Sequence, residues 1–184
     1  SAIAAGKTRR SEMEQITGKP VGGYLTRLED DYGVIAKQLP VGAKPLSKNA
    51  LYVITDNFFT FWFRFIFKYA HIIEIGAYRQ LRLLIKRDYP TFSGLTLERY
   101  FREKAKESQC YTLIGRWWDR KGENEIDMIA ANELDKTLEI CEIKRNRKNI
   151  DLEVLEKKTA QMLTATHLFN GYECHLRALD LQDM

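Results

Sequence analysis

The fold of the C-terminal half is decided by residues 125–144, which read EIDMIAANELDKTLEICEIK. Two apolar runs are separated here by a short polar turn, a pattern typical of two neighbouring strands. Side chains on a strand alternate between its faces, so Glu142 and Lys144 must project the same way. Asp127 lies on the preceding strand, and we expect the three charged groups to meet at one place on the sheet.

Two carboxylates and an ammonium group at the edge of a hydrophobic sheet are costly unless their charges are used. The residue types indicate binding of a hard divalent cation, which prefers oxygen ligands and activates a water beside a phosphate. The alternative interpretation is a cluster of surface salt bridges with little energetic value. Ile140, Cys141 and Ile143 favour the first interpretation, because they mark a buried strand rather than an exposed edge.

The residues on either side of this stretch complete an α/β domain. We expect helices over 96–106 and after a cap at Asp151 or Asn149, and strands over 110–117, 125–131, 137–144 and 173–179. The helical crossover before the last strand predicts that this strand runs parallel to its neighbour. The expected fold class is therefore α/β, or α+β over the whole chain, with a mixed sheet flanked by helices.

The N-terminal part has the order of elements of a winged helix-turn-helix. A short helix ends at Gly18, and the apolar residues from Val21 to Leu28 recur with helical spacing. Strands over 34–39 and 51–54, joined by a loop rich in Gly and Pro, form the wing. Only the tail of a first helix is visible at 1–5, so we expect the chain to be the C-terminal piece of a larger protein.

A helical connector is expected between the two parts. Asp56 is a good N-cap for the aromatic helix FFTFWFRFIF, which must be buried on most sides or dock on a partner. Pro90 and Gly94 indicate the next boundary. We predict a winged helix over 1–55, the connector over 56–90 and the α/β domain over 91–184.

Composition excludes several classes of protein. A net charge of +4 permits binding of nucleic acid without demanding it. Cys110, Cys141 and Cys174 are widely spaced, which fits a reducing compartment and no zinc-finger pattern. The start lacks the apolar core of a signal peptide, and the run Phe58 to Phe67 is too short to span a bilayer. We expect a cytoplasmic protein with no membrane partner.

Three stretches carry a resemblance to known families: IGRWWDRKGENEIDMIA, EICEIKRN and ITDNFFTFWFRFIF. An acid, a hairpin and then Glu-X-Lys on the next strand, with a helix before them, resemble the PD-(D/E)XK nuclease superfamily over the second half of the chain. The whole chain resembles the C-terminal region of archaeal-type P-loop ATPases that are also found in bacteria. In those proteins an ATPase module is followed by a winged helix and a restriction-endonuclease-like domain. This chain has no GxxxxGK[ST] motif, so ATP is expected only in the preceding part.

The resemblance implies a role for each charged residue. Asp127 and Glu142 would bind Mg²⁺ or Mn²⁺, and Lys144 would orient or deprotonate the attacking water. Glu98 would be an additional catalytic acid, and Glu125 a supporting acid, placed by alternation on the face of Asp127. DNA phosphates would be held by basic residues around the site and on the winged helix, namely Arg116, Lys121, Arg145, Arg147, Lys19, Arg27, Lys44 and Lys48.

Three functions stay open at this point. The first is a metal-dependent nuclease domain that acts on DNA phosphodiesters and is attached to an N-terminal ATPase module. The second is a DNA-binding or regulatory module without cleavage, although Glu29, Asp30 and Asp31 make the expected recognition helix a poor surface for a polyanion. The third is a docking domain for the attached ATPase. Nucleases that cut two strands often pair, so a homodimer is compatible with the first function.

Overall fold

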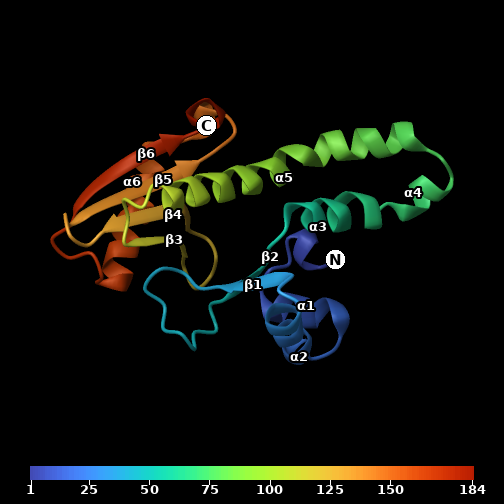
Figure 1. The fold of residues 1–184 in the computed structure, drawn as a ribbon, viewed down its shortest axis with the longest axis horizontal. Helices are drawn as coiled ribbons and strands as arrows, with labels where there is room; N and C mark the ends of the chain where they lie inside the picture. The colour runs from blue at the N-terminus through green and yellow to red at the C-terminus, as the bar shows by residue number, and fades with distance from the viewer. The chain divides into compact units, whose positions relative to one another are not determined.

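The computed structural model describes every residue from Ser1 to Met184, and its elements are labelled in Figure 1. The chain forms two compact units. Unit 1 consists of Ser1–Leu39 and Ser47–Phe92, and unit 2 of Pro40–Leu46 and Ser93–Met184. A two-stranded and a four-stranded sheet combine with helices, which confirms the expected mixed α and β class. The predicted three-part division stays a prediction, and most of its first two parts fall in unit 1.

The first half of unit 1 is a small helical cluster closed by a hairpin. Its elements are η1 (Ile3–Ala5), α1 (Arg10–Thr17), α2 (Gly22–Thr26), η2 (Arg27–Asp31), β1 (Ile35–Gln38) and β2 (Leu51–Ile54). The helix α1 ends as predicted at Gly18, whose φ of 65° is accessible to glycine at little cost. The strands β1 and β2 pair antiparallel, and Met13, Leu25 and Ile35 are buried in the core beneath them.

The second half of unit 1 is aromatic and helical. It contains α3 (Asn57–Phe61), η3 (Trp62–Phe67), α4 (Ala70–Glu74) and the first part of α5 (Tyr78–Glu107). Asp56 caps α3 as predicted, by accepting a hydrogen bond from the Phe59 N–H. The expectation that this segment is buried on most sides was wrong, although Phe65 packs on α5 and Phe63 packs on the core beneath the hairpin. Phe65 is completely buried against Phe92, whereas Phe58 and Phe67 are more than half exposed.

The helix α5 continues through Pro90 and Gly94, where the sequence predicted a break. A proline inside a helix removes one hydrogen bond and crowds the preceding turn. The turns on either side are each held by packing, which outweighs this cost: Phe92 contacts Phe61 and Phe65, and Leu97 lies in the core of unit 2. The boundary between the units therefore falls within a helix, at Phe92 and Ser93.

Unit 2 is a four-stranded mixed sheet with helices on both faces (Figure 1). Its elements after α5 are β3 (Leu113–Trp118), β4 (Glu125–Asn132), β5 (Thr137–Ile143), η4 (Arg147–Asn149), α6 (Leu152–Thr166), β6 (Glu173–Leu179) and η5 (Leu181–Asp183). The strands lie in the order β3-β4-β5-β6, and β6 runs parallel to β5 as predicted. Leu155 and Met162 of α6 pack on one face, and Leu97 and Phe101 of α5 on the other.

The strand β4 contains a β-bulge at the position of the predicted site. Gly115 pairs with Ile129 but Trp117 pairs with Ile126, so β4 has one more residue than β3 between these pairs. A bulge breaks the alternation of faces and redirects a side chain. Asp127 lies inside this bulge, so the prediction that alternation sets it on the face of Glu125 does not apply.

A short segment of the β1–β2 loop, Pro40–Leu46, belongs to unit 2. The Val41 N–H donates to the Arg116 carbonyl at 2.8 Å and so continues the hydrogen bonding of the edge strand β3. Gly115 is required beneath it, because an added Cβ would lie 2.5 Å from Cγ2 of Val41. The expected wing is thus shared between the two units.

Candidate functional site

The structure brings Asp127, Glu142 and Lys144 together, as the sequence predicted. The Lys144 Nζ lies 3.0 Å from Oδ2 of Asp127 and 2.8 Å from Oε1 of Glu142. Lys144 directly follows β5, and its backbone N–H donates to the Leu179 carbonyl at the end of β6. The three groups are therefore held by the ends of three adjacent strands.

Asp127 is fixed by its side chain and by its backbone. Its carboxylate is 2% exposed, and Oδ2 accepts the Ile143 N–H at 2.9 Å. Regular pairing of β4 with β5 ends at Met128 and Cys141, so this carboxylate satisfies a backbone donor that the ladder leaves unpaired. On the other side, Arg102 Nη1 donates to the Asp127 carbonyl at 2.8 Å. These bonds hold the bulge in one conformation.

Glu142 is buried between two ammonium groups. Oε1 faces Lys144, and Oε2 lies 3.2 Å from the Nζ of Lys158 on α6. Sequence reasoning missed Lys158. The sequence does indicate that Lys158 faces inward, because it lies one helical turn from both Leu155 and Met162. These two are buried residues of an amphipathic helix. A lysine at such a position has to find a partner for its charge.

Glu98 faces inward from α5 as expected and is 8% exposed. Its Oε2 has no hydrogen-bond partner, although Arg116 Nη2 lies at 3.4 Å and Arg102 Nη1 at 3.7 Å. Burial, followed by the charge of Asp127, raises the pKa of Glu98 to about 7. Glu125 is more exposed and reaches the group only through Arg116, at 3.5 Å.

Burial alone would lower the pKa of the Lys144 ammonium. The charge of Asp127 and hydrogen bonds to both carboxylates outweigh burial and raise this pKa above its usual value. Burial lowers the pKa of Arg102 to about 10, which still leaves it charged at neutral pH. Lys144 is therefore a hydrogen-bond donor in this arrangement, and removal of a proton from water is not a role that suits it.

These groups form one charged cluster, which we define as Glu98, Glu125, Asp127 and Glu142 with Arg102, Arg116, Lys144 and Lys158. Each acid lies within 3.7 Å of at least one of the basic groups. Four carboxylates and four cations leave no formal net charge when all are ionised. Such compensation permits charges to remain in a mostly buried site.

The other basic residues predicted to bind DNA are divided between the two units. Lys121 and Arg145 are exposed on loops of unit 2. Arg147 is exposed and pairs with Asp183, whose Oδ2 lies 3.3 Å from its Nη1. Of the remaining four, Lys44 lies in unit 2, Lys19, Arg27 and Lys48 lie in unit 1, and Arg27 pairs with Asp31 at 3.6 Å. Binding of DNA by these residues stays a prediction.

The donor set fits a small hard cation that keeps part of its water. No group of three or more His, Cys, Asp or Glu side chains is arranged to hold a metal ion. Mg²⁺, however, is commonly bound by one or two carboxylates with waters and substrate phosphates. Asp127 and Glu142 supply such a pair, and the Oε2 of Glu98, which accepts no hydrogen bond, is a further buried acceptor. A cation between the pair requires movement of the Lys144 ammonium.

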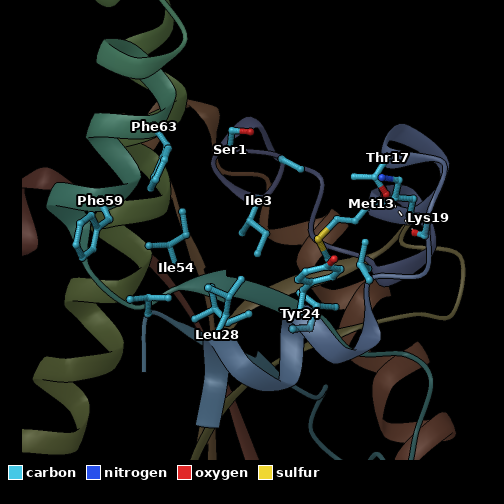
Figure 2. A pocket seen from close by; sticks show the side chains of 15 residues that line it. Ser1, Ile3, Met13, Thr17, Lys19, Tyr24, Leu28, Ile54, Phe59 and Phe63 are labelled. Carbon is cyan, nitrogen blue, oxygen red and sulfur yellow. Dashed lines mark hydrogen bonds between the residues drawn. The ribbon is translucent and has the colours of Figure 1, made fainter. Parts of the chain in front are cut away.

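Unit 1 contains a pocket of a different kind, with a volume of about 590 Å³. Ile3, Leu28 and Ile54 surround it (Figure 2). Lys19 is the only Asp, Glu, His, Lys or Arg residue in the lining, and the rest of the wall is mainly apolar. This pocket suits an apolar group, and Lys19 has no carboxylate beside it in the lining for acid–base chemistry.

No helix has both the length and the apolar character that crossing a membrane requires. A family model described as "Archaea bacterial proteins of unknown function" (DUF234) matches residues 62–163, a segment that contains the whole charged cluster. An uncharacterized protein of Methanocaldococcus jannaschii is 35% identical over 153 residues, which are 78% of this chain and 34% of that protein. The chain thus spans about one third of the length of this relative. No solved structure matches.

Proposed function

The chain belongs to the family of archaeal and bacterial proteins whose model matches residues 62–163, and we propose that its unit 2 is a metal-dependent nuclease domain of the PD-(D/E)XK type that acts on DNA phosphodiesters. One observation carries this proposal. The Lys144 ammonium lies within 3.0 Å of both Asp127 and Glu142, in a site that is mostly closed to solvent. Such a concentration of buried charge is expensive for a purely structural element.

The order of elements supports the same proposal. A helix carries Glu98, a bulged strand carries Asp127, the next strand carries Glu142 and leads into Lys144, and a helix then crosses to a parallel strand. The bulge and the end of regular pairing at Met128 and Cys141 interrupt the backbone ladder where the carboxylates lie, so side-chain oxygens take the place of backbone pairs there.

Each residue of the cluster has a separate role in this proposal. Bound Mg²⁺ or Mn²⁺ would lower the pKa of a coordinated water and polarise the phosphate. Asp127 and Glu142 hold the cation, and Lys144 donates hydrogen bonds to the phosphate oxygens as negative charge develops on them. Glu98 Oε2 is able to accept a proton, because its pKa is about 7 and no hydrogen bond occupies it.

The wider setting belongs to the same proposal. The resemblance of the sequence to the C-terminal region of archaeal-type P-loop ATPases supports the proposal that a separate module of a longer protein would bind ATP. A cytoplasmic location would follow from a DNA substrate. In that setting the nuclease domain would act on DNA that the ATPase part holds or moves.

A nicking assay tests the proposal. Supercoiled plasmid is incubated with the protein and Mn²⁺, Mg²⁺ or EDTA. The fraction converted to the relaxed, nicked form is then measured on an agarose gel. We expect divalent-dependent nicking that Asp127→Asn and Lys144→Ala each reduce at least roughly 100-fold, the scale of losing one transition-state contact. Lys148→Ala is the matched control, because Lys148 is exposed and lies just after the site.

Two outcomes would overturn the proposal. One is that a Mn²⁺ titration followed by calorimetry gives the same weak heat for the wild type and for Asp127→Asn. The other is nicking that survives both substitutions, which would identify it as a contaminating nuclease. Thermal melting of each variant shows whether it is folded.

The docking alternative is favoured by features of unit 1. The apolar pocket and the exposed Phe58, Trp62 and Phe67 present surface that a partner could cover. This function predicts association with the attached ATPase module in place of cleavage. Gel filtration of the two parts mixed together tests it, and loss of association in Trp62→Ser with retained melting would support it.

A further inference from the structure

The helix α6 directs a lysine toward the sheet instead of toward solvent. Leu155 and Met162 are completely buried and define the inner face of α6. Lys158 lies between them on this face, and its side chain is only 16% exposed. A lysine near a surface normally extends its ammonium into water. Here the ammonium stays inside and contacts the proposed metal ligand Glu142.

Lys158 and Lys144 contact the cluster in different ways. Lys144 bridges Asp127 and Glu142, and its side chain is 37% exposed. Lys158 contacts Glu142 alone, at the oxygen that Lys144 does not use. When Lys144 moves to admit a cation, Lys158 is still able to hold Oε2. Glu142 then presents only Oε1 toward Asp127.

We propose that Lys158 is a positioning residue that fixes the Glu142 carboxylate and sets how tightly the site binds a divalent cation. This inference rests on the proposed function. The ammonium orients the ligand, and its positive charge opposes a cation on the same carboxylate. The free protein would therefore bind metal weakly, and the site would fill more readily when metal arrives with the negative charge of a phosphate. In this arrangement Lys158 weakens metal binding by the free protein and favours productive geometry with substrate.

A substitution that removes the charge but keeps most of the length of the side chain distinguishes the effect on metal binding from the effect on cleavage. Lys158→Met should tighten Mn²⁺ binding by the free protein by roughly tenfold or more, since a like charge near the metal is lost. The same variant should cut DNA more slowly at saturating Mn²⁺, by roughly tenfold, because Glu142 is no longer oriented. Lys158→Arg should restore both values toward the wild type.

Lys157→Met is the matched control. Lys157 is the neighbouring residue on α6 and is exposed, so this substitution makes the same change in charge without touching Glu142. Mn²⁺ affinity is measured by isothermal calorimetry on the full chain, and the rate by the nicking assay across a Mn²⁺ series. A merely structural role would lower the melting temperature and weaken metal binding, and it would not tighten it.

The outcomes distinguish this inference from the function on which it rests. If the wild type gives no Mn²⁺ heat, the metal site itself is wrong. If the wild type binds Mn²⁺ but Lys158→Met binds equally or more weakly, the role given to Lys158 is wrong while the metal site stands. If Lys157→Met tightened Mn²⁺ binding by the same factor, the role of Lys158 would also be wrong, because the lower net charge alone would then explain the effect.

Discussion

The charged cluster of unit 2 and the apolar pocket of unit 1 differ in what is buried: charged groups are buried in the first, and apolar surface is left uncovered in the second. In the cluster, acids and bases are brought within 3.7 Å of one another and closed off by a sheet and two helices. In the pocket, apolar side chains leave about 590 Å³ unfilled. In the cluster, folding free energy is lost to keep charged groups buried. In the pocket, apolar surface stays uncovered. Chemistry is expected of the former and association of the latter.

The largest difference between the two regions should be the loss of stability when a buried side chain is shortened. Ile140 is completely buried in the sheet, so Ile140→Ala should lower the free energy of unfolding by about 4 kcal/mol. Ile54 is buried in the core of unit 1 but also lines the pocket, so part of its side chain faces the cavity and Ile54→Ala should cost less, about 2 kcal/mol.

Urea unfolding measures both losses. Trp117 and Trp118 are buried and report on unit 2, and Trp62→Phe removes the exposed tryptophan of unit 1 for that experiment. Far-ultraviolet circular dichroism reports on the helices of unit 1. Equal costs at the two positions would show that the pocket is as well packed as the sheet.

Removal of one charge from the cluster should have the next largest effect. Asp127→Ala leaves the Ile143 N–H and the Lys144 ammonium without their shared partner, so unfolding should become easier by about 3 kcal/mol. Asp127→Asn keeps an oxygen for the Ile143 N–H and should lose less. Urea unfolding at pH 7 compares them, and an Asn variant as unstable as Ala would contradict the hydrogen-bond argument.

Glu98 should make stability depend on pH. Its folded pKa of about 7 lies above the ordinary value of 4.5, so between these values the folded protein binds more protons than the unfolded chain. Stability contributed by this group is therefore present at low pH and is lost as pH rises toward 7. Glu98→Gln should remove the loss and be more stable than the wild type at pH 8 by about 2 kcal/mol.

The measurement is urea unfolding of wild type and Glu98→Gln at pH 5 and pH 8. The difference between the two proteins should grow with pH. A constant difference would mean that Glu98 is ionised throughout and that the arginines stabilise its charge.

The smallest effect is expected at the edge of the sheet. Gly115→Ala places a Cβ against Val41, so the Pro40–Leu46 segment has to shift by a few tenths of an ångström or more. We expect a cost of about 1 kcal/mol and faster proteolysis within this segment. Gly23→Ala is the control, because nothing lies near its added Cβ. Unchanged proteolysis would show that the segment is held by other contacts.

Local patterns predicted much of unit 2. The positions of β4, β5 and β6 and the parallel pairing of the last two followed from apolar runs and one helical crossover. The convergence of Asp127, Glu142 and Lys144 followed from the same strands, because the i and i+2 residues of a strand share a face.

What could not be predicted depends on packing between distant residues. The bulge at Asp127 is set by the register with β3, which no local pattern reports. Arg102 and Lys158 join the cluster because helices from both faces meet the end of the sheet. The passage of α5 through Pro90 was missed because proline argues locally for a boundary, whereas the packing that sustains the helix is tertiary.

The segment Pro40–Leu46 has a consequence for any division of this protein into fragments. A cut between Phe92 and Ser93 leaves the C-terminal fragment without Val41, whose N–H bonds the edge strand β3 at Arg116. It also removes Gly42, which packs on Thr166 at a φ of 83°. Neither unit is a continuous stretch of chain. The fragments 1–92 and 93–184 should therefore behave as complementing halves, with the second gaining protease resistance only when the first is supplied.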